Sequence, residues 1–227
     1  MIRVLVADDE PMIRAGVRAV LATAPDITVV AEAGDGGQAV DLALRHRPDV
    51  AVLDIRMPGL DGIRAAEEIH RALPDTGVIV LTTFGEDDYI LRALGGGATG
   101  FLIKSGEPEE LIAGVRAVAD GAAYLSPKVA ARVVAHLASG GAGAGAARRR
   151  AARERVAGLT VRERDVLALL GAGLTNGQIA RRLGVVEGTV KAHVSSVLAR
   201  LGVDNRAAAA VVAHEAGAVA APAPDQV

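Results

Sequence analysis

The chain has 227 residues, enough for one large or two ordinary domains; 51% of them are hydrophobic but only 2% are aromatic. So few rings argue against RNA binders and single-strand DNA binders, which stack bases on aromatic side chains. The absence of cysteine excludes disulfides and cysteine-ligated zinc, consistent with a reducing compartment. No apolar run approaches the roughly 18 residues of a membrane span, and residues 1–9 lack a secretory signal, so we expect a cytoplasmic protein without a membrane partner.

The net charge of −2 conceals two halves of opposite character. Residues 1–147 hold 13 basic and 20 acidic residues, whereas residues 148–215 hold 12 basic and 6 acidic ones. An acidic half suits metal or phosphate chemistry, and a basic half suits a polyanion. Much of the basic excess comes from the arginine run at 148–155. A solvated charge cluster explains this run as well as binding to a polyanion does. The charge pattern favours two domains.

The first 120 residues alternate short aliphatic runs with amphipathic stretches of helical period. Strands are predicted over Ile2–Ala7, Ile27–Glu32, Asp49–Asp54, Val78–Thr82 and Gly100–Lys104. Helices are predicted over Pro11–Ala22, Gly37–Arg45, Ile63–Leu73, Asp87–Leu94 and Glu109–Asp120. Because near-continuous apolar strands indicate burial on both faces, we expect an α/β domain over residues 1–120: a five-stranded, parallel, doubly wound (flavodoxin-like) sheet with helices on either side.

Residues 121–157 are predicted to link the two domains. Ser126 followed by Pro127 is a helix-start signal, which predicts a helix over 126–138. Residues 139–147 contain only Ser, Gly and Ala and precede the arginine run. This part is either a flexible coil or, in its Arg-Ala portion, a helix, and the sequence leaves both open.

Residues 158–217 are predicted to form a small all-α domain of four helices. Thr160 with Glu163, and Thr175 with Gln178, have the spacing of capping boxes and mark two helix starts. Two further helices are predicted over Glu187–Leu201 and Asn205–Glu215. Residues 218–227, with two prolines and no periodicity, are expected to form a loose tail.

Acidic residues follow two of the predicted strands: Asp8 and Asp9 come after the first, and Asp54 ends the third. Ligands of open α/β sheets bind at these carboxyl ends. Carboxylates 4 Å apart repel by about 4 kcal/mol at an effective dielectric of 20, so a divalent cation is expected among them. Hard oxygen ligands favour Mg²⁺. Thr82 and Lys104 end two more strands and complete a phosphate-binding set.

The stretch from Thr175 to Val194 has the turn and spacing of a helix-turn-helix motif. The second helix of the motif has two opposite faces. One face consists of Val190, Val194, Val197 and Leu201, and the other consists of Gly188, Lys191, Ala192, Ser195 and Ala199. The second face is small enough to approach a DNA groove, where Lys191 meets guanine or phosphate and Ala192 a thymine methyl. A helical face for docking a protein is the alternative.

The first 120 residues resemble the receiver domain of bacterial two-component response regulators. The resemblance lies in Asp8-Asp9, residues 54–62, Thr82 and the stretch Phe101-Leu102-Ile103-Lys104. It implies that a sensor histidine kinase phosphorylates Asp54 and that Mg²⁺ is held by Asp8, Asp9, Asp54 and the backbone carbonyl of Arg56. It also implies that Lys104 pairs with the phosphoryl oxygens, that Thr82 moves inward to bond one of them, and that Phe101 is an aromatic switch residue turning inward with Thr82. Ser105 stands where many receivers have proline, so no cis peptide is expected.

The second half is similar to the LuxR-type domain, and both halves together to the NarL/FixJ family of response regulators. The matching segments are Leu159–Arg164, Gly173–Asn176, Thr189–Val194 and Leu201–Arg206. The family implies that the third helix enters the major groove, that the fourth helps to pair two copies, and that DNA contacts come from Asn176, Thr189, Lys191, Ala192, His193 and Ser195. The expected function is a transcription factor that forms homodimers on double-stranded DNA when phosphorylated and catalyses only its own phosphoryl transfer and dephosphorylation.

Two other functions stay open at the sequence level. One is a Mg²⁺-dependent phosphohydrolase with Asp54 or Asp9 as nucleophile, although Arg56 occupies the position where such enzymes carry a second acid. The other is a receiver whose helical domain docks a protein instead of DNA. The cognate kinase, the operator, the regulated genes and the direction of regulation do not follow from the sequence.

Overall fold

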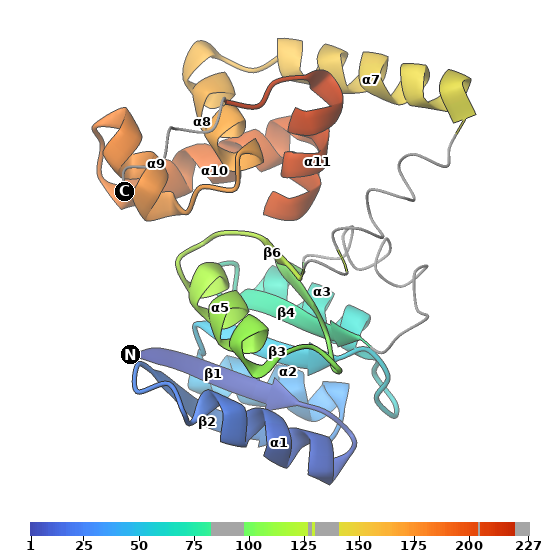
Figure 1. Cartoon of the computed structure of the whole chain (residues 1–227), viewed down its shortest axis with the longest axis vertical. Coiled ribbons are helices and arrows are strands. Elements are labelled where there is room, and N and C mark those ends of the chain that lie inside the picture. Colours follow the sequence, from blue (N-terminus) through green and yellow to red (C-terminus); the bar gives the residue numbers. More distant parts are fainter. Residues whose placement is uncertain (83–97, 127–128, 130–140, 204, 221–227) are drawn as a thin grey trace. The chain divides into compact units, whose positions relative to one another are not determined.

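The structure is a computed structural model that describes residues 1–82, 98–126, 129, 141–203 and 205–220. The chain divides into two compact units, Met1–Val134 and Ala135–Val227 (Figure 1). Each unit has its own hydrophobic core. The two-domain organisation predicted from the charge pattern is therefore matched by two separately packed halves.

The first unit is built on a parallel sheet with the strand order β2-β1-β3-β4-β5-β6. Its strands are β1 (Ile2–Ala7), β2 (Ile27–Ala33), β3 (Val50–Asp54), β4 (Gly77–Thr82), β5 (Gly100–Ile103) and β6 (Tyr124–Leu125). Every residue of β3 and β5 is buried, and so are the last four of β1, as their near-continuous apolar runs predicted. The strand order reverses between β1 and β3, and open α/β sheets bind ligands outside the carboxyl ends of strands at such a point.

The sixth strand corrects the prediction of five. Tyr124 and Leu125 pair in parallel with Gly100 and Phe101 of β5, within the segment predicted to be a linker. A strand of two residues is too short to show an alternating pattern, so the sequence carried no signal for it. The short strand covers part of the edge that β5 would otherwise expose.

Helices cover both faces of this sheet. They are α1 (Pro11–Leu21), α2 (Gly36–His46), α3 (Gly62–Ala72) and α5 (Pro108–Ala119). α1 contacts α5, and α2 contacts α3, which gives the two helical layers (Figure 1). α2 and α3 begin at Asp35 and Asp61, whose carboxylates accept from the backbone N–H groups three residues on. The helix predicted over 87–94 lies outside the described residues.

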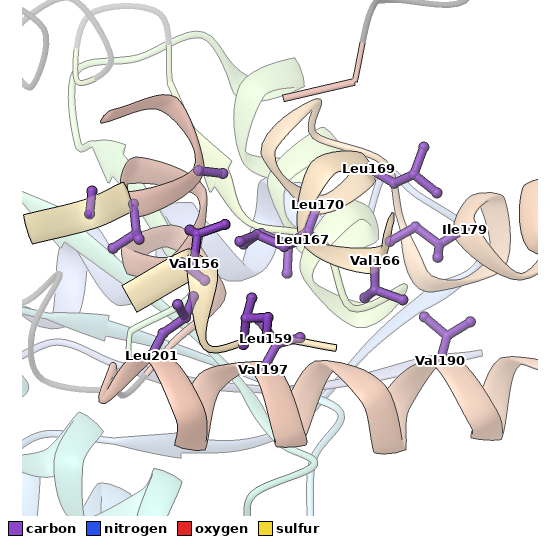
Figure 2. Packing of buried hydrophobic residues seen from close by; sticks show 14 of the residues in the cluster. Val156, Leu159, Val166, Leu167, Leu169, Leu170, Ile179, Val190, Val197 and Leu201 are labelled. Atoms are coloured by element: carbon purple, nitrogen blue, oxygen red, sulfur yellow. The ribbon is translucent and has the colours of Figure 1, made fainter. Parts of the chain in front are cut away.

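The second unit contains α7 (Gly141–Ala157), α8 (Val161–Gly171), α9 (Asn176–Leu183), α10 (Glu187–Leu201) and α11 (Arg206–Ala216). Both predicted capping boxes are formed, at Thr160 with Glu163 and at Thr175 with Gln178. Figure 2 shows the core between the helices, where branched aliphatic side chains from α8, α9 and α10 interlock. No helix among the described parts of the chain is both long and apolar enough to cross a bilayer.

The structure differs from the prediction at the C-terminal end of the linker and at the N-terminal end of the tail, which both pack on the helical domain. α7 takes in residues 141–147 and the arginine run, so the Arg-Ala portion is helical, which was one of the two alternatives. Its Ala152 and Val156 are buried in the core of the helical unit. These residues are four apart and so form one small apolar seam on the helix. At the other end, Ala220 N–H donates to the Ala168 carbonyl at 3.0 Å, so the tail is packed as far as that residue. Of the helix predicted over 126–138, only Ser126 and Val129 are described.

Candidate functional site

The three acidic residues of the strand ends come together in the first unit. Asp8 and Asp9 follow β1, Asp54 ends β3, and these two strands are paired neighbours. One carboxylate oxygen from each residue lies within 4.8 Å of the others. Asp8 is 0% exposed and Asp54 5% exposed, whereas Asp9 is exposed. The structure therefore contains the acidic pocket that the strand-end positions predicted.

Lys104 neutralises part of this negative charge. It follows β5, and its Nζ lies 2.8 Å from Asp8 Oδ2 and 3.0 Å from Asp54 Oδ1. Burial disfavours the charged ammonium, but hydrogen bonds to the two carboxylates outweigh it, so the pKa of Lys104 is raised. Burial also raises the pKa of Asp54, against the lowering effect of Lys104. One ammonium facing three carboxylates leaves an excess of negative charge in the pocket.

The donor set of the pocket fits a divalent cation such as Mg²⁺. All three side chains offer carboxylate oxygens, which this hard cation prefers. The exposed Asp9 leaves the cluster open on one side, so a cation that keeps some of its water can enter. The backbone carbonyl of Arg56, which lies two residues beyond Asp54 in the following loop, stays a prediction as a fourth ligand.

Thr82 lies at the carboxyl end of β4, and Phe101 is the second residue of β5. Thr82 ends β4 and is 1% exposed, and its carbonyl accepts from Lys104 N–H at 2.8 Å. Phe101 on β5 is 0% exposed, so its ring occupies the interior in this structure. The hydroxyl is thus on the strand next to β3 and the ring is on the strand after it, and their movement on phosphorylation stays a prediction.

In the second unit, α10 has the two faces that its sequence period predicted. Val190, Val197 and Leu201 are buried in the core (Figure 2). The opposite face is exposed and is formed by Gly188, Lys191, Ala192, Ser195 and Ala199. Thr189 and His193 flank it and are half-buried. Ser195 Oγ donates to the Lys191 carbonyl at 3.1 Å, so its hydroxyl also serves the helix itself. This exposed face consists of small side chains and one lysine.

Asn176 is buried, unlike the residues on the exposed face of α10. The sequence predicts a DNA contact for it, but its side chain is 6% exposed at the start of α9 and its Oδ1 accepts from Arg206 Nη1 at 2.7 Å. Arg206 Nη2 also donates to the Leu174 carbonyl, so the first residue of α11 closes over the turn before α9. The Asn176 side chain therefore stabilises this turn, and a DNA contact by Asn176 stays a prediction.

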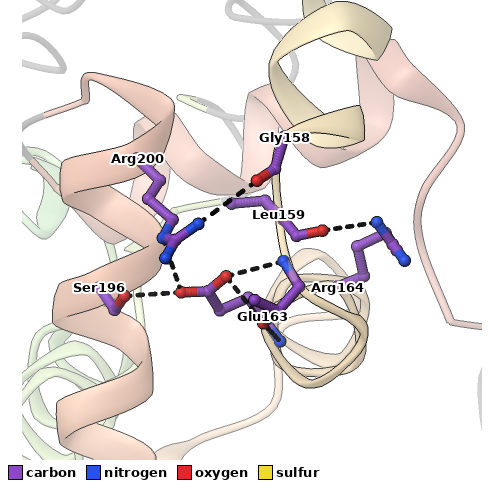
Figure 3. A network of polar contacts seen from close by, with 7 residues as sticks. Gly158, Leu159, Glu163, Arg164, Ser196 and Arg200 are labelled. Atoms are coloured by element: carbon purple, nitrogen blue, oxygen red, sulfur yellow. Dashed lines mark hydrogen bonds and ion pairs between the residues drawn. The ribbon is translucent and has the colours of Figure 1, made fainter.

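A buried carboxylate fixes α10 against the start of α8 (Figure 3). Glu163 Oε1 accepts from Ser196 Oγ at 2.6 Å and lies 3.1 Å from Arg200 Nε. Its Oε2 accepts from the backbone N and the Oγ1 of Thr160, both at 2.8 Å. Hydrogen bonds from Ser196 and then Thr160 lower the pKa of Glu163 from 4.5 to about 2. The exposed face of α10 is thereby held in a defined orientation within its unit.

Each half of the chain matches a family of known proteins. Residues 4–116 match the model of the response regulator receiver domain, and residues 157–213 that of the bacterial regulatory proteins of the luxR family. The transcriptional regulatory protein LiaR of Bacillus subtilis is 40% identical over 94% of this chain and 97% of its own. The nitrate/nitrite response regulator protein NarL of Escherichia coli is 38% identical over 93% and 94%. The chain belongs to the NarL/FixJ response regulators.

A solved structure agrees with this assignment. The response regulator ChrA of a heme-sensing two-component system is 36% identical, with a TM-score of 0.53 over 96% of this chain and 98% of its own. The present chain is thus a two-component response regulator with a receiver domain and a LuxR-type DNA-binding domain. Its acidic pocket lies in the receiver, and the exposed face of α10 lies in the LuxR-type domain.

Sequence reasoning on this response regulator missed three residues that shape these sites. Arg14 Nη1 donates to the Asp8 carbonyl at 2.6 Å, and Gly62 lies against the backbone of Asp54. Arg206 closes over the turn before α9. The available signals were a basic residue in the first turn of α1 and a glycine directly after the capping Asp61. Neither signal indicates which distant residue it contacts in the folded chain.

The pKa of Glu163 predicts an acid-labile LuxR-type domain. Because the folded pKa is lowered, the carboxylate stabilises the domain above pH 4.5, and this stabilisation is lost as the pH falls from 4.5 to about 2. Hydrogen exchange of residues 158–217 in the full chain, measured at intervals from pH 6 to pH 3, should show protection falling in the lower part of this range. The variant E163Q should be less protected at pH 6 and less sensitive to acid, whereas E154Q, at an exposed pair with Arg150, should follow the wild type. Parallel pH profiles for E163Q and the wild type would contradict the assignment.

Proposed function

We propose that phosphorylation of Asp54 by a sensor histidine kinase switches this response regulator between two states. In the phosphorylated state the chain pairs with a second copy and binds double-stranded DNA at a specific sequence, which regulates transcription. The observation that carries this proposal is the bridging position of Lys104 Nζ, 2.8 Å from Asp8 and 3.0 Å from Asp54, beside a third carboxylate. Such a pocket combines a nucleophile, a fixed cation and ligands for a second cation.

The proposed reaction makes one bond and breaks one. A carboxylate oxygen of Asp54 bonds to phosphorus while the bond from phosphorus to the donor nitrogen breaks, and that nitrogen keeps the electron pair. Lys104 stays close enough to pair with the transferred phosphoryl oxygens. Asp8, Asp9, Asp54 and the Arg56 carbonyl would hold Mg²⁺, which supplies charge neutralisation at these oxygens. Phosphoryl transfer requires mainly this positioning and neutralisation from the protein.

The signal is proposed to leave the pocket through β4 and β5. A phosphoryl group on Asp54 adds acceptor oxygens, and the Thr82 hydroxyl moves to donate to one of them. The resemblance implies that Phe101 turns inward with Thr82; its ring is already buried on β5 in this structure, and we propose that the inward position is the one kept when Thr82 moves. Phosphorylation shifts the population of the two states by the difference in their affinity for the phosphoryl group.

For the LuxR-type domain, we propose that α10 enters the major groove. Lys191 is the exposed cation for guanine or phosphate, and Ala192 is the apolar contact for a thymine methyl. Thr189, His193 and Ser195 complete the contact set at its borders. Two copies would place their α10 helices in successive major grooves, about 34–36 Å apart on the duplex.

We also propose that the chain acts in the cytoplasm and has no enzymatic activity beyond its own phosphorylation and dephosphorylation. The position two residues after Asp54 is the exposed Arg56, where a phosphohydrolase of the kind considered above requires an acid. A basic side chain there cannot protonate a leaving group as a carboxylic acid does.

Acetyl phosphate with Mg²⁺ tests the proposal directly. The wild type is expected to gain the mass of one phosphoryl group and to bind duplex containing its site more tightly afterwards. D54A should lose the mass gain and the change in affinity together. K191A should keep the mass gain but bind duplex more weakly before and after labelling, with a smaller dependence on salt.

Several outcomes would contradict the proposal. A wild type that gains no phosphoryl group, or a D54A variant that gains one equally well, excludes Asp54 as the acceptor. Labelling without any change in duplex affinity excludes control of DNA binding. Turnover of phosphomonoesters in excess of the protein would favour the phosphohydrolase, and loss of duplex binding in every state at low salt would favour protein docking.

A further inference from the structure

We propose that Arg14 on α1 is a positioning residue for the cation site and fixes the loop that carries Asp8 and Asp9. This inference rests on the proposed Mg²⁺ site but concerns a residue outside its ligands. Arg14 is not a member of the acidic cluster, and its side chain is 21% exposed. Mg²⁺ affinity then depends on the hydrogen bond from Arg14 to the loop backbone, although the positive charge of Arg14 repels a cation.

Arg14 contacts both the loop after β1 and a carboxylate on β2. Its Nη1 donates to the Asp8 carbonyl at 2.6 Å, at the residue where the chain leaves β1. Its Nε lies 3.6 Å from Glu32 Oε2 on β2, and Arg18 Nη1 lies 2.9 Å from Glu32 Oε1. The planar guanidinium thus reaches the loop with one nitrogen while another faces an anchored carboxylate.

The loop needs such an anchor because Asp9 has none of its own. Asp8 is held by Lys104 and by the Glu10 N–H, which donates to Asp8 Oδ1 at 2.9 Å. The Asp9 side chain makes no hydrogen bond or ion pair with any residue that the structure describes. Its carboxylate is nevertheless within 4.8 Å of the other two. The direction of Asp9 is therefore set by its backbone, which Arg14 fixes one residue earlier.

A positioning role of Arg14 and an effect of its charge alone predict opposite changes in cation affinity for R14M. Removing a nearby positive charge would by itself strengthen the binding of a cation. Freeing the Asp8 carbonyl would instead loosen the ligand loop and weaken binding, because residues that orient metal ligands affect metal affinity strongly. We expect R14M to bind the cation about tenfold more weakly, at the low end of the range for such residues. R14K keeps a donor for the carbonyl and should recover most of the affinity.

Arg18 provides the matched control. It is on the same helix, pairs with the same Glu32 and is 56% exposed, but among the described residues its side chain has no hydrogen bond or ion pair to the loop. R18M removes the same charge four residues away. We expect its cation affinity to equal or slightly exceed that of the wild type, because only the charge has changed.

The experiment measures Mn²⁺ binding to the full chain by the loss of the electron paramagnetic resonance signal of free Mn²⁺, with Mg²⁺ as competitor. A second readout is the Mg²⁺ concentration that gives half the maximal rate of Asp54 labelling by acetyl phosphate. This concentration should rise in R14M, while the maximal rate at saturating Mg²⁺ stays within about twofold of the wild type. Urea unfolding checks that the variants are folded, and R14Q replaces R14M if the latter is not.

The outcomes separate this inference from the proposed function. No Mn²⁺ binding by the wild type overturns the cation site itself. Binding by the wild type with equal or tighter binding by R14M overturns the positioning role and leaves the cation site intact. Equal weakening of R14M and R18M also overturns it, since a loss shared by both helix arginines comes from charge or from Glu32 alone.

Discussion

G62A is expected to lower the free energy of unfolding of the receiver domain by about 3 kcal/mol, at the upper end of the usual cost of overpacking. A Cβ at this position would lie 1.8 Å from the Asp54 carbonyl oxygen and 2.8 Å from the carbonyl carbon. Both are backbone atoms of β3, so the clash cannot be relieved by rotating a side chain. The peptide that carries the phosphoacceptor must move, and Asp54 labelling by acetyl phosphate should fall with stability.

G16A is the control for this substitution. Gly16 lies in the middle of α1 and is exposed, and a methyl group attached there would meet nothing within 4 Å apart from its chain neighbours and the backbone of its own helix, so alanine fits. Replacing glycine by alanine in a helix should raise stability by about 0.5–1 kcal/mol. Urea unfolding followed by circular dichroism measures both variants, with midpoints compared at constant slope. A G62A midpoint equal to that of the wild type would show that the close approach to Asp54 does not constrain this position.

R206M is expected to destabilise the LuxR-type domain by about 3 kcal/mol and to abolish duplex binding while Asp54 labelling continues. Arg206 is 5% exposed and donates to Asn176 Oδ1 at 2.7 Å and to the Leu174 carbonyl. Methionine fills similar space but donates nothing. Two acceptors at the turn before α9 then lose a charged donor, and buried acceptors without donors are costly. The turn sets the position of α9 and thereby of α10.

A double-variant cycle checks the origin of this loss. N176L removes the main buried acceptor, so R206M should cost less in the N176L background than in the wild type. R153M, which changes an exposed arginine of α7 without an ion pair among the described residues, should alter stability by no more than about 0.5 kcal/mol. Fully additive effects of R206M and N176L would show that the Arg206–Asn176 bond does not stabilise the turn.

The site was predictable where it depends on periodic local geometry. Strands of the receiver end at fixed positions, so carboxylates after β1 and β3 had to meet at one edge of the sheet. The capping boxes follow from residues three apart on one turn. The exposed and buried faces of α10 follow from its helical period. In each case the partners are close in sequence or are related by a regular repeat.

Other features depended on contacts between distant segments. Ser196 donates to Glu163 across 33 positions of sequence, and Arg206 donates to Asn176 across 30. Strand β6 was too short to leave a pattern, and α7 falls in a predicted linker because Ala152 and Val156 offer only a narrow apolar seam.

The sequence by itself therefore determined the two domains, the order of their main elements and the chemical types gathered at the strand ends, because hydrophobic period and residue type are local properties of the chain. Only the tertiary structure decided that Lys104 bridges Asp8 and Asp54, that Arg14 bonds the loop beside them and that Glu163 holds α10. These contacts require segments packed at ångström distances, and the position of one helix or strand against another is set by the whole core.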